Sequence, residues 1–241
     1  MAADQAATTQ ATAPRYSIIV PVLDEAASLP AQLAQIERDH LRGGRAELIV
    51  VDGGSSDGTA ELAARVGRVI QAPRGRAAQM NAGAAAARGD VLIFPHADTR
   101  LPPDALDVIE RALAEPTVVG GAFRLSFDAP GVAFRLIAAS VTWRCLSRHI
   151  YTGDQAYVVR RDAFARVGGF PDQPLMEDME IVKRLRRVGQ FVLFPVAVTT
   201  SARRHQQTGI ARTLLLMGLI RTLYAVGVSP DRLHRLYLDI R

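Results

Sequence analysis

Cysteine is almost absent from this chain of 241 residues, because Cys145 stands alone. A single cysteine excludes an intrachain disulfide and a cysteine cluster for zinc, and it fits a reducing compartment. Lysine is as scarce: Lys183 is the only one, and every other side-chain cation is arginine. Arginine grips phosphate with a planar fork, so the net charge of +5 favours anionic partners such as nucleotides or acidic lipids. Codon usage is the simpler explanation for so much arginine.

Long hydrophobic runs are missing as well. A membrane-spanning helix needs about 18 apolar residues, and the nearest stretch, residues 210–228, is interrupted by Arg212 and Arg221. Residues 1–14 lack the basic start and apolar centre of a signal peptide, and we interpret them as a disordered tail. We therefore expect a cytoplasmic protein, with peripheral contact at the inner face of the membrane as an alternative.

Two nucleotide-binding fingerprints are also absent. The Gly-x-Gly-x-x-Gly of dinucleotide-binding folds directly follows the first strand, but residues 24–27 read Asp-Glu-Ala-Ala at that place. No Gly-Lys-Ser/Thr of a phosphate-binding loop occurs anywhere. No nucleic-acid-binding motif accompanies the arginine excess, so we expect no nucleic-acid partner.

Short apolar runs alternate with amphipathic stretches through the first half of the chain. The predicted strands cover residues 16–23, 47–52, 68–71, 91–94, 121–127, 155–160 and 191–198. The predicted helices cover residues 28–39, 59–66, 77–87, 103–114, 132–146, 162–167 and 179–188, and the chain is helical again from residue 210. This alternation predicts an α/β domain over residues 15–205, with a mostly parallel central sheet flanked by helices. Residues 206–241 are assigned to a C-terminal helical extension.

Polar side chains follow three of the predicted strands. Asp24 and Glu25 follow the first strand, Asp52 the second, and His96 and Asp98 the fourth. The carboxyl ends of parallel strands meet at one edge, where such sheets bind ligands. Asp52 can accept hydrogen bonds from a base or a ribose, or it can cap its loop.

The loop after the second strand, residues 53–58, contains a further acid, Asp57. For Asp57 we favour a capping role.

His96 and Asp98 flank a small residue. In an extended chain alternate side chains point the same way, so both could face one cation. Mg²⁺ needs few protein oxygens when substrate phosphates supply the others. The alternative is a turn in which Asp98 caps the next helix.

Three acids, Glu177, Asp178 and Glu180, lie at a predicted helix start. The helix dipole favours acids there, and a carboxylate near a reacting hydroxyl can also serve as general base. Further cations at loops or helix starts could bind phosphate or simply face solvent. They are Arg74, Arg76, Arg203, Arg204 and His205.

Together these motifs resemble family 2 glycosyltransferases with the GT-A fold. The matching segments, in order, are residues 19–25, 50–59, 75–83, 96–98 and 177–178. Residues 153–155, 168–171 and 174–178 add a resemblance to a small bacterial subgroup labelled arsenosugar-pathway or selenium-associated glycosyltransferases.

The resemblance implies an inverting transfer of a sugar from a nucleoside-diphosphate sugar, with uridine preferred, to an acceptor hydroxyl. It assigns the nucleotide pocket to Pro21, Leu23, Glu25, Asp52, Arg76 and Asn81. Asp98, with His96, would hold Mg²⁺ or Mn²⁺ on the diphosphate, and Asp178, beside Glu177, would be the catalytic base. His96 replaces the first acid of the family's Asp-x-Asp motif, which suits Mg²⁺ poorly and leaves the choice of metal open.

Two other functions stay open. A non-catalytic nucleotide-sugar-binding module would explain His96. A sugar-1-phosphate nucleotidyltransferase normally has a glycine-rich basic loop after its first strand, whereas residues 24–27 are acidic there. The acceptor is unnamed and could be lipid-linked. The C-terminal helices could pack on the domain, form a homodimer or contact a membrane.

Overall fold

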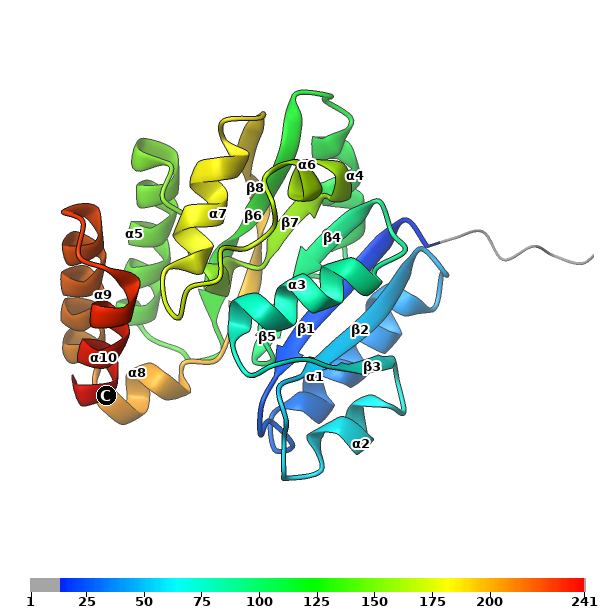
Figure 1. Cartoon of the computed structure of the whole chain (residues 1–241), viewed down its shortest axis with the longest axis horizontal. Coiled ribbons are helices and arrows are strands. Elements are labelled where there is room, and N and C mark those ends of the chain that lie inside the picture. The colour runs from blue at the N-terminus through cyan, green and yellow to red at the C-terminus, as the bar shows by residue number, and fades with distance from the viewer. Residues whose placement is uncertain (1–13, 241) are drawn as a thin grey trace, which may run out of the picture.

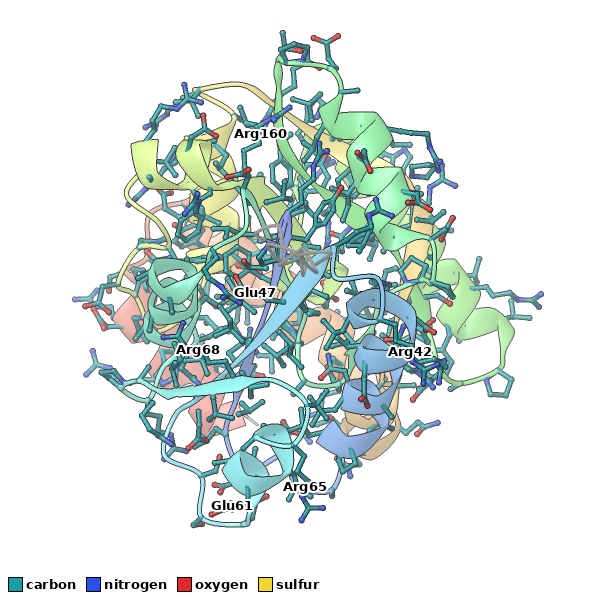
Figure 2. The ribbon with its side chains drawn as sticks, turned by 90° about the vertical axis from the view of Figure 1, so that its right-hand side faces the viewer. Arg42, Glu47, Glu61, Arg65, Arg68 and Arg160 are labelled. Atoms are coloured by element: carbon teal, nitrogen blue, oxygen red, sulfur yellow. The ribbon has the colours of Figure 1, made fainter. Side chains whose placement is uncertain are left out.

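The computed structural model describes residues 14–240, apart from the side chains of residue 204 and residues 238–240 (Figure 1). The predicted tail, except Pro14, lies outside the described residues. The chain forms one eight-stranded mixed sheet with helices on both faces. Figure 2 shows α1 and α3 on opposite sides of this sheet.

Four parallel strands form the first half of the sheet, as predicted. They are β1 (Tyr16–Val22), β2 (Ala46–Asp52), β3 (Arg68–Gln71) and β4 (Val91–Phe94). β1 pairs with both β2 and β4. The strands therefore follow the order 3-2-1-4 across the sheet: β2 and β3 are added on one side of β1 and β4 on the other, and all four strands remain parallel. The connecting helices are α1 (Leu29–Ile36), the π-helical turn η1 (Glu37–Leu41), α2 (Thr59–Ala63), α3 (Arg76–Ala86) and, after β4 and β5, α4 (Ala105–Leu113). A reversal of strand order of this kind opens a crevice at the carboxyl edge, which positions a ligand site.

The second half of the sheet is mixed. Its elements are β5 (Thr99–Arg100), β6 (Val118–Phe127), α5 (Val132–Arg148), η2 (Gly153–Gln155), β7 (Tyr157–Arg160), α6 (Arg161–Arg166), α7 (Glu177–Leu185) and β8 (Gln190–Thr200). β7 runs antiparallel to both β4 and β6, whereas β6 and β8 are parallel. β5 pairs antiparallel with β8 at the sheet edge. The α/β fold with a mostly parallel sheet is therefore confirmed.

Several predicted boundaries were wrong. The strand predicted over residues 155–160 begins at Tyr157, because Thr152 and Gln155 cap each other across a 3₁₀ turn over residues 153–155. The helix predicted over residues 179–188 begins at Glu177. β5 was not predicted, since two residues give no periodicity to detect.

Helix α3 packs closely on β1 and β2. Both strands are buried on their two faces, with Ile19 and Val51 fully buried. A Cβ atom added at Gly83 would lie 2.3 Å from Ile19 Cγ2 and 2.9 Å from Val51 Cγ2. Only glycine lets the helix approach this closely, so Gly83 sets the height of α3 above the sheet.

Three helices complete the chain: α8 (Arg203–Thr208), α9 (Ile210–Ala225) and α10 (Pro230–Ile240). Ile220 of α9 and Leu233 of α10 enclose Met176, which directly precedes α7, in a second small apolar cluster. The start of α7 is thus held by the C-terminal helices. No helix within the described part of the chain is long and apolar enough to cross a membrane.

Candidate active site

The loops after β1 and β2 form one wall at the carboxyl edge of the sheet. Asp24 takes a left-handed backbone conformation (φ 53°), and its carboxylate accepts a hydrogen bond from the Ser56 N–H at 2.8 Å. The Glu25 N–H donates to Thr59 Oγ1 at 2.9 Å. Asp57 accepts from the Thr59 N–H at 3.1 Å and from the Ala26 N–H at 2.9 Å, so its side chain joins the two loops, while Gly58 is the N-cap of α2.

Asp52 lies at the base of this wall, and its side chain makes hydrogen bonds within the protein. One carboxylate oxygen accepts from the Ser55 N–H at 3.1 Å, and the other accepts from Gln71 Nε2 at 2.9 Å. Burial alone would raise the pKa of Asp52, but the hydrogen bonds from Ser55 and Gln71 outweigh it and keep the pKa below its ordinary value. Asp52 is therefore an ionised anchor of the loop, and contact with a base stays a prediction.

Pro21, Leu23 and Glu25 follow one another along the end of β1 and remain partly exposed. The Glu25 carboxylate accepts a hydrogen bond from the Ser28 hydroxyl. The three side chains line the same edge as Asp52, as the resemblance implies for a nucleotide pocket.

Helix α3 contributes three polar side chains. Gln79, which we had not singled out, donates from Nε2 to the Val22 carbonyl at 2.7 Å and to the Val51 carbonyl at 2.8 Å. It thereby fixes the ends of β1 and β2 to α3. Its only signal in the sequence was its place within the motif at residues 75–83.

Asn81 makes a two-way contact with the backbone of Phe170. Its Nδ2 donates to the Phe170 carbonyl, and its Oδ1 accepts from the Phe170 N–H, both at 2.9 Å. Asn81 therefore anchors the turn over residues 168–171 and supports the pocket through that turn.

The segment that follows β4 is a turn. The Thr99 N–H donates to the His96 carbonyl at 3.0 Å, so residues 96–99 are not extended and our alternation argument was wrong here. The two side chains have different neighbours. A Cβ atom on Gly153 would lie 3.0 Å from His96 Nε2, whereas Asp98 lies within electrostatic range of Glu25 and Arg203.

The partly exposed Asp98 carboxylate sits among charged groups. Burial and the nearby Glu25 carboxylate raise the pKa of Asp98, and the guanidinium groups of Arg203 and Arg76 act against this. A divalent cation would offset both the burial and the repulsion from Glu25.

No group of three His, Cys, Asp or Glu side chains that could hold a metal occurs among residues 14–240 where side chains are described. The donor set at Asp98 and His96 therefore fits a cation only if a diphosphate and water supply its other ligands. Mg²⁺ and Mn²⁺ accept such a shared site.

Gly153 lies between the Asp178 side chain and the His96–Thr99 turn. One Asp178 carboxylate oxygen accepts from the Gly153 N–H at 2.8 Å, and the other accepts from the Met179 N–H at 2.8 Å. The Cβ atom that Gly153 lacks would lie 3.6 Å from Asp178 Cβ. Burial raises the pKa of Asp178, while the Gly153 hydrogen bond and Arg76 oppose that rise. His96, Gly153 and Asp178 therefore share one corner of the site.

Glu177 is the buried partner of Asp178, with 4% of its surface exposed. Its carboxylate lies 3.8 Å from Arg76 Nη1 at the start of α3. Burial, followed by repulsion from Asp178, raises the pKa of Glu177 to about 7. The pair thus holds a proton to much higher pH than two isolated carboxyl groups would.

This raised pKa predicts a pH-dependent stability. The unfolded chain releases the Glu177 proton near its ordinary pKa of 4.5, whereas the folded chain keeps it to about 7. The free energy of unfolding should therefore fall as pH rises through this interval, by about 3 kcal/mol at most. Glu177→Gln should remove most of this fall, and Glu61→Gln, at an exposed position, should retain it. Urea unfolding at pH 5 and pH 8 measures the change in the free energy of unfolding with pH. If this change were the same for Glu177→Gln and the wild type, the prediction would be contradicted.

Arg221 was not predicted as a site residue. It lies on α9, within electrostatic range of Asp154 and Asp178. Burial, followed by the like charge of Arg144, lowers the pKa of Arg221. No sequence signal could have found it, because it only interrupts an apolar stretch far from the motifs.

Comparisons with known proteins identify the family and the fold. A family model described as glycosyl transferase family 2 matches residues 17–169. The undecaprenyl-phosphate 4-deoxy-4-formamido-L-arabinose transferase of Pseudomonas aeruginosa is 37% identical over 115 residues, which cover 43% of this chain and 34% of that protein. The probable glycosyltransferase YdaM of Bacillus subtilis is 24% identical over 77% of this chain and 50% of its own length. The chain thus spans a third to a half of the length of these relatives.

Solved structures share the fold. One is the mannosyltransferase PcManGT of Pyrobaculum calidifontis in complex with GDP-Man and Mn²⁺, with a TM-score of 0.68 and 21% sequence identity. The superposition covers 95% of this chain and 70% of the PcManGT chain. S. aureus TarS (residues 1–349) in complex with UDP-GlcNAc covers 78% of this chain and 58% of its own, with a TM-score of 0.62 at 17% identity.

The family model matches more than half of the chain, over the strands and loops that form the pocket wall. The chain therefore belongs to glycosyl transferase family 2.

Proposed function

We propose that this glycosyltransferase moves a sugar from a UDP-linked donor to an acceptor hydroxyl with inversion, using Asp178 as general base. The observation that carries this proposal is the corner where Gly153 holds the Asp178 carboxylate at 2.8 Å beside the His96–Thr99 turn. A base and a diphosphate-binding turn must be this close if a hydroxyl is to attack the anomeric carbon while the diphosphate leaves.

The chain's own residues divide the work. Asp178 takes the proton of the attacking hydroxyl, and the Gly153 N–H keeps its carboxylate in one orientation. Glu177 lies 3.8 Å from Arg76 and, whenever it is ionised, its charge repels that of Asp178 and so favours proton uptake by the base. The proposed nucleotide pocket comprises Pro21, Leu23, Glu25, Asp52, Arg76 and Asn81, with Asn81 acting through the turn it anchors.

A divalent cation, Mg²⁺ or Mn²⁺, would supply charge neutralisation at the departing diphosphate. Asp98 would hold it, with His96 as a second donor that favours Mn²⁺. Support comes from fold neighbours in complex with Mn²⁺, including glucosyl-3-phosphoglycerate synthase of Mycobacterium tuberculosis with Mn²⁺ and UDP.

Asp98→Ala should therefore weaken nucleotide binding at least about tenfold with Mn²⁺ present, and should hardly change it in EDTA. Titration calorimetry with UDP under both conditions measures this. Asp172→Ala, at an exposed position, is the matched control. Equal Mn²⁺ dependence in Asp98→Ala and the wild type would remove Asp98 from the metal site.

A lipid-linked acceptor is part of the proposal. The relatives named as undecaprenyl-phosphate transferases support it, as does Arg221, which lies within electrostatic range of both Asp178 and Arg144. Residues 153–155, which include Asp154, support placement in the subgroup labelled arsenosugar-pathway or selenium-associated. Cys145, buried and unbridged, fits the proposed cytoplasmic location.

A thermal-shift screen of nucleotide sugars with Mg²⁺ and Mn²⁺ tests the donor, and NMR of the product tests inversion at the anomeric carbon. A UDP-sugar that raises the melting temperature and is turned over with inversion supports the proposal. Binding without transfer or hydrolysis, with any metal or acceptor, would favour a non-catalytic module, which the His96 replacement keeps in contention.

A further inference from the structure

Large exposed apolar side chains are concentrated on two helices. Where side chains are described, only Val188 and Val226 among them lie elsewhere, and Val226 directly follows α9. The others are Val132, Leu136, Trp143 and Leu146 on α5, and Leu214, Leu215 and Leu219 on α9. Trp143 is 61% exposed and Leu215 75% exposed. Scattered exposed apolar residues are ordinary, but a concentration like this marks an interaction surface.

On α5 these residues form one stripe. Leu136 follows Val132 by one helical turn, and Trp143 and Leu146 continue the same face two and three turns later. The opposite face, with Phe134, Ile137 and Val141, packs on the sheet. A helix inside a protein core would be apolar all round, but α5 has a sheet on one side only.

Helix α9 runs beside α5. His205, just before α9, packs edge-on against Phe134 of α5 with ring centroids 6.2 Å apart. At the other end, Arg148 of α5 and Tyr224 of α9 line one cavity of about 190 Å³. Figure 1 places both helices at the end of the molecule farthest from β3. We call the exposed stripes of α5 and α9 together the docking face.

The two helices that form the docking face contain no acidic residue. Residues 129–153 and residues 181–230, which include both helices, contain no aspartate or glutamate. Arginines flank the stripes; Arg135, Arg148 and Arg212 are exposed. Apolar side chains edged by arginine match the surface of a bilayer that contains anionic lipid. A second copy of the chain fits worse, because a symmetric contact would bring these arginines against one another.

We propose that α5 and α9 dock this protein on the surface of an anionic lipid bilayer, with Trp143 and Leu215 entering the headgroup region. Tryptophan prefers that depth because its ring is apolar and its N–H is polar. Docking does not depend on which sugar or acceptor the enzyme uses. It would, however, present the side of the site that contains Arg221 and Asp178 towards the bilayer.

Trp143 is the only tryptophan of the chain, so its fluorescence reports on the docking face without any substitution. Vesicles of phosphatidylglycerol and phosphatidylcholine should shift the Trp143 emission to shorter wavelength, and brominated lipid should quench it. Vesicles of phosphatidylcholine alone should bind much less, and added salt should weaken binding to the anionic vesicles. Emission that does not respond to anionic vesicles would overturn the proposal.

Flotation with the same vesicles locates the contact. Leu136→Asp and Leu215→Asp should each reduce the bound fraction by about tenfold, because each places a carboxylate on the docking face. Val188→Asp makes a matched change at an exposed site away from it and should float like the wild type. Thermal melting shows that the variants are folded.

Docking through this face would be contradicted if Leu136→Asp and Leu215→Asp floated like the wild type, or if Val188→Asp lost flotation to the same extent as they do. It would also be contradicted if vesicles bound no protein and gel filtration showed a dimer that Leu215→Asp dissociates. Donor and acceptor are absent from every sample, so failure here would leave the proposed transfer reaction untouched.

Discussion

Asp178→Asn is expected to lower kcat by about 10²–10⁴-fold while leaving the affinity for the nucleotide sugar unchanged. The asparagine side chain has the same shape, and its amide oxygen can still accept the Gly153 N–H that holds Asp178 at 2.8 Å. Its NH2 group cannot accept the Met179 N–H, so that hydrogen bond is lost, and the side chain can no longer take a proton. The raised pKa of Asp178 makes the loss larger, because a carboxylate that binds protons more tightly is a stronger base.

Initial rates at saturating donor, together with calorimetric titration of the donor, separate these two effects. Asp172→Asn, on the exposed loop before α7, is the matched control and should keep the wild-type rate. Full activity in Asp178→Asn would assign the proton to another group. A loss of donor binding equal to the loss of rate would make Asp178 a binding residue.

Gly83→Ala should destabilise the fold strongly, although it is the mildest possible substitution within a helix. Its new methyl group would lie 2.3 Å from Cγ2 of the fully buried, β-branched Ile19 side chain, which has little room to move. We expect a cost of about 3 kcal/mol or more, because α3 must rise off β1 and β2. Gln79 would then lose its hold on the Val22 and Val51 carbonyls, and the pocket wall would loosen with it.

The chain contains its own control for this prediction. Gly218 is also within a helix, but an added Cβ there meets nothing within 4 Å. Gly218→Ala should stabilise by about 0.5–1 kcal/mol through helix propensity alone. Differential scanning calorimetry of both variants should give melting temperatures that move in opposite directions. Similar shifts for the two would show that the close approach at Gly83 is unimportant.

The first half of the fold could be predicted because three of its strands, β1, β2 and β4, are buried on both faces. Runs such as residues 16–22 and 46–52 consist almost wholly of apolar residues, and turn residues separate them from the helices. The place of Asp52 and Asp98 at the carboxyl edge followed from that alternation alone. What remained open was the contact each side chain makes, since Asp52 binds its own loop and Asp98 depends on neighbours from other elements.

The second half was harder because long-range pairing decides it. β7 inserts between β4 and β6 in the opposite direction, and no local pattern encodes that choice. The turn at His96–Thr99 was kept only as the alternative, because Pro95 and the following residues are also compatible with an extended chain. Arg221 reaches the site only through the packing of α9, which joins residues far apart in sequence.

Helix α5 shows a different limit. Residues 132–146 were predicted as a helix, but apolar residues occur on both of its sides, so hydrophobic periodicity could not tell its inner face from its outer one. The structure separates them, because Phe134 and Ile137 are buried and Leu136 and Trp143 are not.

Met176 links the docking face to the candidate active site. Its backbone is left-handed (φ 66°), a strained conformation for a side chain of this size, and burial between Ile220 and Leu233 offsets the strain. The residue that sets the start of α7, and hence the place of Asp178, is therefore held between α9, which belongs to the proposed membrane contact, and α10. Binding at two coupled sites is reciprocal. If bilayer binding raises the affinity for the acceptor by some factor through Met176, acceptor binding must raise the affinity for the bilayer by the same factor. An enzyme built this way would stay longest on the membranes that contain its acceptor.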